Sequence, residues 1–237
     1  MLLEIIAACV EDAIIAEQNG ADRIELITAI TEGGLTPGIG MVRQAVRTVR
    51  IPVHVMVRPH SRSFVYDEAD QAVMAEEIRA IKDAGAAGIV IGALTSDGQI
   101  DQAALERWLP LTEGMNVTFH RAFDELSNLL EGLEVLQQYP QVNRILTSGG
   151  PKPAPQAVPV LRELVRRTEQ AKRSGRNLTI LAGHGLTAQG IGDFVRETGV
   201  EEVHFGTAVR CGGDGLKPID PVRLSELAGR LREIAGR

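Results

Sequence analysis

The sequence alternates between short apolar runs and longer amphipathic stretches from one end to the other. The runs are rich in Val and Ile, which favours strands, and they cover residues 2–8, 23–27, 53–57, 88–93, 116–121, 144–148, 178–183 and 202–207. The stretches between them repeat apolar residues at helical spacing and predict helices over residues 11–19, 40–49, 68–83, 102–111, 126–139, 157–173, 188–198 and 221–235. Such alternation is typical of a parallel sheet with a helix after every strand.

The residues at the helix ends support this alternation. Gly20, Gly85 and Gly199 each follow a predicted helix and precede a predicted strand. A glycine just past a helix adopts the left-handed conformation at little cost and ends the helix there. The last helix is predicted to begin at Pro221, with Asp220 as its N-cap.

Eight strand–helix units leave two architectures, an open doubly wound sheet or a closed barrel. The 237 residues divide into eight units of about 30 residues, the usual size of a βα step. No G-x-G-x-x-G motif follows the first strand, where the turn reads Cys9-Val10-Glu11-Asp12, and no phosphate-binding P-loop motif occurs. The sequence therefore predicts a (β/α)8 TIM barrel, an α/β fold that forms one domain over residues 1–237.

Composition excludes several classes of partner. Two cysteines cannot form a disulfide framework or a four-thiolate zinc site. The net charge is −6, and the most basic stretch, residues 162–176, also carries Glu163 and Glu169. We interpret that stretch as a solvated helix face, so no nucleic-acid partner is expected.

The same reasoning argues against a membrane partner. The start of the chain lacks the basic segment of a signal peptide, and the most apolar interior stretch, residues 84–94, is shorter than the about 20 residues that span a bilayer. We therefore expect a cytoplasmic protein in which Cys9 and Cys211 are free thiols.

Alternation along the strands predicts which side chains enter the lumen, the space enclosed by the barrel. In the third strand, outward valines at positions 53, 55 and 57 leave His54, Met56 and Arg58 facing inward. The same argument points these side chains inward from the other strands: Glu4, Ile6, Arg23, Glu25, Ile27, Asn116, Thr118, His120 and His204. Charged groups are costly to bury unless they are paired or used, and barrel enzymes build their sites at the carboxyl ends of the strands. We therefore expect a polar functional cavity, although any single inward histidine could be structural.

Glycines after the last two strands suggest an anion site. Gly183 and Gly185 flank His184 after the seventh strand, and Gly206 follows the eighth. Such loops can present backbone N–H groups to phosphate, with Thr187 as the expected N-cap of the next helix and Arg58 as a source of charge. Ordinary glycine turns would explain the same residues.

Six segments are similar to the CutC family of copper homeostasis proteins. They are residues 19–27 (NGADRIELI), 32–38 (EGGLTPG), 52–60 (PVHVMVRPH), 92–99 (GALTSDGQ), 117–125 (VTFHRAFDE) and 144–151 (RILTSGGP). The resemblance implies a barrel fold, a cytoplasmic location, a homodimer and a role in copper handling. It also implies site residues at Glu4, Glu25, Arg58, His120, Arg121, Asp124 and His204, of which Arg121 is the one that strand alternation points outward.

The resemblance does not extend to two cysteines of the family. Family members thought to bind Cu(I) carry cysteine where this chain has Ile6 and Ile27. Cu(I) prefers soft sulfur ligands, and Met56 is the soft residue expected in the lumen, with His54 beside it as a second weak metal candidate. The cofactor therefore stays open, as copper or another divalent metal ion.

Two functions follow, with a scaffold or dimer module as the fallback. The first is copper handling, which the resemblance implies. The second is a lyase or isomerase acting on a small anionic metabolite that could carry phosphate. In it, Glu25 or His120 is the general base, His204 is the acid partner and Arg58 binds the anion. The expected partner is thus a small anionic ligand or a metal ion.

Overall fold

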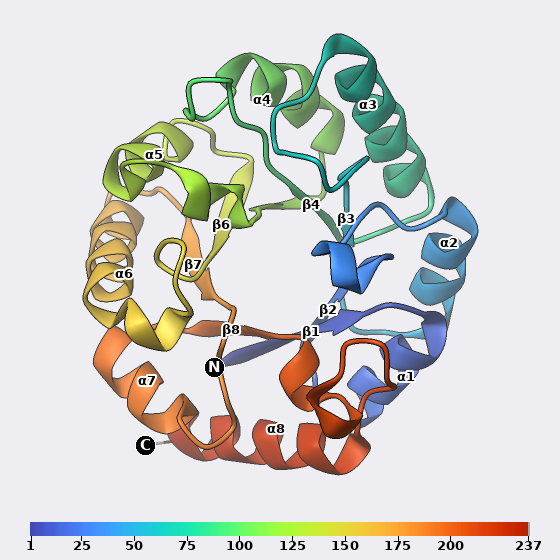
Figure 1. Ribbon diagram of the computed structural model, residues 1–237, viewed down its shortest axis with the longest axis vertical. Helices are drawn as coiled ribbons and strands as arrows, with labels where there is room; N and C mark the ends of the chain where they lie inside the picture. Colours follow the sequence, from blue (N-terminus) through green and yellow to red (C-terminus); the bar gives the residue numbers. More distant parts are fainter. Residues whose placement is uncertain (237) are drawn as a thin grey trace.

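A closed barrel of eight parallel strands, neighbours in sequence order, forms the centre of the molecule (Figure 1). The structure is a computed structural model that describes residues 1–236. The strands are β1 (Leu2–Ala7), β2 (Arg23–Leu26), β3 (Val53–Met56), β4 (Gly88–Ile91), β5 (Asn116–Phe119), β6 (Val142–Thr147), β7 (Thr179–Ala182) and β8 (Glu202–Phe205). Parallel pairing of β1 with β8 closes the sheet.

Helices surround the barrel on its outside, one after each strand (Figure 1). They are α1 (Val10–Gln18), α2 (Ile39–Thr48), α3 (Glu68–Asp83), α4 (Gln102–Trp108), α5 (Leu129–Leu136), α6 (Val158–Arg173), α7 (Ile191–Thr198) and α8 (Pro221–Ala235). The predicted (β/α)8 barrel is therefore confirmed. None of the helices formed by residues 1–236 is long and apolar enough to cross a membrane.

Several predicted boundaries are wrong because side chains redirect the backbone. The fifth strand ends at Phe119 because Nδ1 of His120 accepts the N–H of Ala122 and starts a 3-10 helix, η3 (Arg121–Glu125). Helix α7 begins at Ile191, so Thr187 does not cap it. The Thr187 hydroxyl instead accepts the N–H of Gly190 in the turn that precedes the helix.

The basic stretch at residues 162–176 is not wholly solvated. The side chain of Arg176 lies beyond the end of α6 and donates to the carbonyl oxygens of Leu136, Tyr139 and Val142. This guanidinium ties the segment after α6 to the segment between α5 and β6. It is therefore a structural link rather than part of a free basic face.

Two apolar clusters reflect the alternation along the strands. Outward residues such as Ile24, Val53 and Val55 are fully buried in the large core between barrel and helices. A separate small cluster inside the lumen contains Ile27 and Met56. The lumen thus contains an apolar cluster as well as the charged inward residues.

Strand β4 and the residues after it leave space for two histidine rings. A Cβ atom at Gly88 would lie 2.7 Å from Cδ2 of His54, and one at Gly92 would lie 2.6 Å from Cε1 of His120. Any side chain at either glycine would therefore displace a ring.

We expect Gly92→Ala to lower the free energy of unfolding by about 1–3 kcal/mol, because the added methyl group overlaps the His120 ring. The matched control is Gly40→Ala, since Gly40 lies in α2 with open space around its Cβ position. That change should stabilise the protein by about 0.5–1 kcal/mol. Urea unfolding of the two variants measures both effects, and equal stabilities would contradict the close packing of His120.

Candidate functional site

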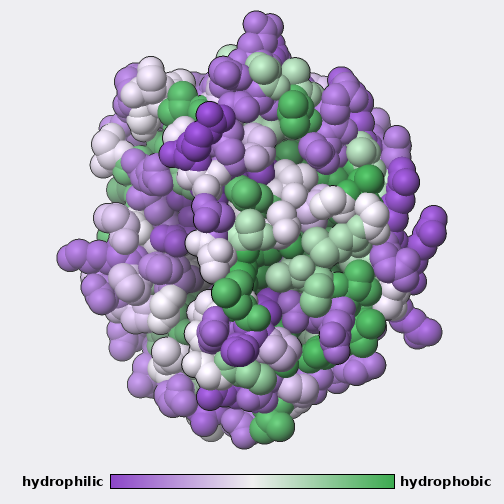
Figure 2. All heavy atoms as spheres, turned by 45° about the vertical axis from the view of Figure 1, so that its right-hand side comes forward, coloured by the Kyte–Doolittle hydropathy of each residue, from purple (hydrophilic) through white to green (hydrophobic). Residues whose placement is uncertain are grey.

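A cavity of about 530 Å³ opens at the carboxyl ends of the strands. Eight of the predicted site residues line it: Glu25, Met56, Arg58, His120, Arg121, Gly185, His204 and Gly206. Its other walls are largely apolar and include Ile6, Ile27, Ile30, Phe64, Leu146 and Leu186. In Figure 2, apolar side chains gather in the middle of the face shown, and hydrophilic side chains cover much of its margin.

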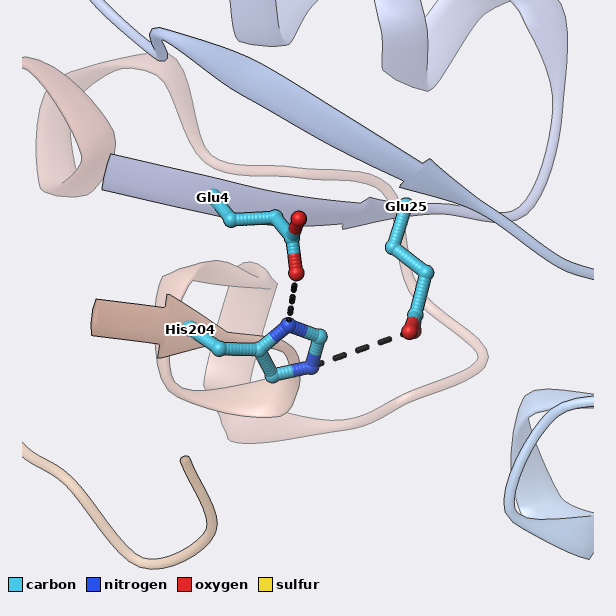
Figure 3. Close-up of side chains that lie close together, drawn as sticks. All are labelled: Glu4, Glu25 and His204. Atoms are coloured by element: carbon cyan, nitrogen blue, oxygen red, sulfur yellow. Dashed lines mark hydrogen bonds and ion pairs between the residues drawn. The ribbon is translucent and has the colours of Figure 1, made fainter. Parts of the chain in front are cut away.

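The floor of the cavity holds a histidine between two carboxylates (Figure 3). The residues come from neighbouring strands, Glu4 from β1, Glu25 from β2 and His204 from β8. Nδ1–H of His204 donates to Oε1 of Glu4 over 2.7 Å, and Nε2 lies 3.9 Å from Oε2 of Glu25. Glu4 therefore fixes the orientation of the ring, and the opposite edge of the ring faces Glu25.

A chain of buried ion pairs continues below this floor. Nε of Arg23 donates to Oε2 of Glu4 over 2.5 Å, and its Nη2 donates to Oε2 of Glu202 over 2.7 Å. Nε of Arg144 donates to the same Glu202 oxygen over 2.7 Å. Two carboxylates and two guanidinium groups thus neutralise one another in the lower lumen, as buried charges require.

Above these paired charges, Glu25 titrates near neutral pH. Burial raises the pKa of Glu25 to about 7, although the nearby His204 opposes the shift. Burial disfavours the charged form of His204, but Glu25 and Glu4 outweigh it and raise the pKa of this imidazole. Burial acts against ionised Glu4 as well, and Arg23 and His204 nevertheless hold its pKa well below the usual range. Oε1 of Glu25 is buried and has no partner among the described residues.

His120 is held as a neutral hydrogen-bond donor. Its Nδ1 accepts the backbone N–H of Ala122 over 3.1 Å, which places the ring proton on Nε2. Nε2 is buried and finds no acceptor within residues 1–236. Burial and the charge of Arg58 lower the pKa of His120 to about 3, so the ring stays neutral at physiological pH.

Arg58 is a buried cation with no carboxylate partner in the part of the chain that the structure describes. Its Nη1 donates to the carbonyl oxygens of Glu32 and Gly34 over 3.1 and 3.4 Å, and its Cζ lies 4.7 Å from the centre of the Phe64 ring. The His120 ring lies 4.8 Å from the same phenyl ring. A buried guanidinium without a counter-ion favours an anionic ligand beside it.

Some predicted residues support the site from outside the cavity. The carboxylate of Asp124 accepts the N–H groups of Ser148 and Gly150, so it fixes the loop after β6. Arg121 does line the cavity, against the alternation argument, because η3 begins there, and its Nε donates to Oδ2 of Asp124 over 2.8 Å. Gly183 lies beneath the lining, where a Cβ atom would be 3.2 Å from Cδ2 of His204.

The comparisons with known proteins agree on one family. The model of the CutC family matches residues 1–209. The chain belongs to the CutC family. It is 39% identical to a family protein CutC of Salmonella enteritidis over 208 residues, 88% of this chain and 80% of the relative. It is 38% identical to one of Mesorhizobium japonicum over 204 residues, 86% of this chain and 76% of the relative.

A solved structure extends this relationship to the fold. A CutC copper homeostasis protein of Streptococcus agalactiae superposes with a TM-score of 0.78 and 29% sequence identity. The match covers 86% of this chain and 97% of that protein. The barrel predicted from the alternating pattern is thus the fold of a relative in the same family.

The residues of this CutC family member do not fit Cu(I). Met56 contributes the one sulfur atom of the cavity lining, and it packs with Ile27 and Val90. Cys9 is exposed outside the cavity, where its thiol caps α1 by accepting the N–H of Asp12. Cu(I) prefers two or more soft ligands, which this lining does not supply.

The histidines and carboxylates do not form a hard-metal site either. Glu4, Glu25 and His204 offer ligand atoms within 4.8 Å of one another. However, Glu4 already binds Arg23 and His204, so only Glu25 and Nε2 of His204 remain for an ion. His54 lies below the cavity lining, where burial lowers its pKa to about 3.

The sequence pattern predicts part of the apolar wall, at Ile6 and Ile27, but it does not predict the aromatic residue that contacts both Arg58 and His120. Phe64 contacts both Arg58 and His120, but it lies in the loop between β3 and α3, where no periodic pattern marks it. The one sequence signal for Phe64 is an aromatic residue within a loop that also carries Arg58 and Arg62.

We expect Glu25→Gln to change how stability depends on pH. Folded Glu25 keeps its proton up to pH about 7, whereas the unfolded chain releases it near pH 4.5. The free energy of unfolding of the unmodified protein therefore falls as pH rises through this window, and the variant lacks this loss. As the pH rises from 4.5 to about 7, the free energy of unfolding of the variant should increase by about 3 kcal/mol relative to that of the unmodified protein. Urea unfolding at a series of pH values measures this difference.

The control for this experiment is Glu11→Gln, because Glu11 is an exposed carboxylate of α1. Its stability curve should run parallel to that of the unmodified protein. If the Glu25→Gln curve also runs parallel over this window, Glu25 does not keep a proton near neutral pH.

Proposed function

We propose that this CutC family member is an enzyme that transfers a proton next to the carbonyl group of a small anionic metabolite, as an isomerase or a lyase. One observation carries the proposal: three buried side chains around one cavity each keep a polar atom without a hydrogen-bond partner among residues 1–236. The atoms are Oε1 of Glu25, Nε2 of His120 and Nε of Arg58. Buried polar groups are normally satisfied, so such a set favours a ligand that satisfies them.

Glu25 and His120 suit two steps of one reaction, and the Arg58 guanidinium supplies positive charge beside them. The Glu25 carboxylate takes a proton from the carbon next to the carbonyl group, since its pKa of about 7 matches neutral pH. The electron pair of the broken C–H bond moves to the carbonyl oxygen, and Nε2–H of His120 donates a hydrogen bond to the enolate that forms. Where the carbon next to the carbonyl group carries a hydroxyl, the hydroxyl proton then moves to the enolate oxygen and that carbon becomes the new carbonyl carbon. Protonated Glu25 returns its proton to the former carbonyl carbon, which completes an isomerisation.

His204 and Glu4 assist Glu25 without touching the substrate carbon. The imidazolium of His204 favours the ionised form of Glu25, which is the form that accepts a proton. Glu4 supports that imidazolium through its hydrogen bond to Nδ1. The apolar wall at Ile27 and Leu146 limits water around the enolate, which strengthens the hydrogen bond from His120.

Proton exchange with solvent tests the proposal. We would incubate the protein in D2O with a panel of ketose phosphates, aldose phosphates and 2-oxo acids and follow the loss of C–H signals by NMR. At least one compound should exchange, and Glu25→Gln should slow its exchange by about 100-fold or more. Loss of the His120 donor in His120→Ala should slow it by about 100-fold as well.

The control variant, Glu11→Gln, should exchange at the unmodified rate, because this carboxylate is exposed on α1. Equal exchange by Glu25→Gln and the unmodified protein would sink the assignment of Glu25 as the base. No exchange with any compound of the panel would count against the reaction class.

Copper handling is the second candidate, because the family relationship favours it. If copper is bound in the cavity, Met56 is the soft ligand available. We expect an anaerobic Cu(I) titration against a competing chelator to give a dissociation constant weaker than about 1 μM. Stoichiometric binding that is tighter than this and is lost in Met56→Leu would favour a copper site instead.

Three further expectations rest on the family and the composition. We propose a cytoplasmic location, a homodimer and a partner that is a small ligand rather than nucleic acid. The net charge of −6 supports the last of these, since nucleic-acid surfaces require a basic face.

A further inference from the structure

We propose that the substrate carries a phosphate group, which the backbone N–H groups of two loops bind above the acid–base residues. The loops are residues 183–187, after β7, and residues 206–208, after β8. Both contribute to the lining of the cavity that contains Glu25 and His120. This inference rests on the proposed function, because it names the class of substrate that the same cavity accepts.

The first loop turns sharply and leaves its amides free. His184 and Gly185 both adopt left-handed backbone conformations, with φ angles of 70° and 77°. Such a conformation is strained for histidine and is characteristic of functional loops. Among the hydrogen bonds of residues 1–236, none uses the N–H groups of Gly185, Leu186 or Thr187. Successive free N–H groups in a turn form a concave site for an anion.

The second loop brings two more free donors to the cavity. The N–H groups of Thr207 and Ala208 have no acceptor in the described part of the chain. Gly206 allows close packing under this loop, because a Cβ atom there would lie 2.8 Å from Cδ1 of Ile6. A side chain at this position would have to displace the end of the Ile6 side chain.

The number of donors favours phosphate over carboxylate at this end. Five free N–H groups match the three terminal oxygens of a phosphate monoester, each of which accepts more than one hydrogen bond. The planar guanidinium of Arg58 and the His120 ring both lie against Phe64, so this guanidinium suits the carbonyl or enolate end of the same molecule. The geometry therefore points to a phosphorylated carbonyl compound that spans the cavity from loop amides to Glu25.

A titration with inorganic phosphate tests this subsite without turnover. We would record amide spectra of the 15N-labelled protein while phosphate replaces chloride at constant ionic strength. The shifts should concentrate on the amides of Gly185, Leu186, Thr187, Thr207 and Ala208 and saturate in the millimolar range. Thr187→Glu places a negative charge in the subsite, so it should weaken phosphate binding by about tenfold or more.

The matched control is Gln189→Glu, which adds the same charge at an exposed position outside the cavity lining. Its affinity for phosphate should equal that of the unmodified protein. Shifts that chloride reproduces, or equal affinities for the Thr187→Glu and Gln189→Glu variants, would overturn the subsite.

The two proposals fail in different ways. Phosphate binding at these amides, together with no proton exchange on any compound, would leave the subsite standing and sink the proposed reaction. Proton exchange on unphosphorylated compounds, together with no phosphate binding, would leave the reaction standing and sink the subsite.

Discussion

The ion pair between Arg23 and Glu4 determines how charge is distributed inside this barrel. Arg23 is almost fully buried and binds two carboxylates, Glu4 above and Glu202 below. Arg144 adds a second positive charge at Glu202, so the lower lumen is neutral. Because these charges cancel, the protonation of Glu25 and His204 is the main electrostatic variable on the cavity floor. The acid–base behaviour of the site thus depends on residues that never face the cavity.

The inward charged groups fall into two sets that differ in how well they are satisfied. Arg23, Glu4 and Glu202 are held by short, direct ion pairs. Higher up, Glu25 and His120 keep buried polar atoms without partners among the residues described, although each carries a comparable desolvation cost. A structural role explains the first set fully. The second set is explained better by a ligand, because a stable fold does not require these groups to be left unsatisfied.

The sequence predicts much of this arrangement because a strand alternates with a period of two residues. That period alone is enough to place His54, Met56 and Arg58 in the lumen. The two-residue period does not determine how far along the barrel axis each side chain lies. By this pattern alone, His54 and Met56 are equally good candidates for the site. The structure separates them, since only Met56 reaches the cavity. Phe64 lies in a loop whose path depends on tertiary packing, which no local pattern encodes.

The closure of β1 against β8 joins residues that lie far apart in the sequence. Glu4 and His204 are 200 positions apart, yet their side chains share a hydrogen bond. A chain that lacks β8 contains the carboxylates of Glu4 and Glu25 but not the His204 imidazole, whose positive charge would offset theirs. Contacts of such long sequence separation form late in folding, because closing the intervening loop costs entropy. The hydrogen bond between Glu4 and His204 therefore forms only after β8 has joined the barrel, and a chain that is cut before β8 lacks the imidazole that lies between Glu4 and Glu25.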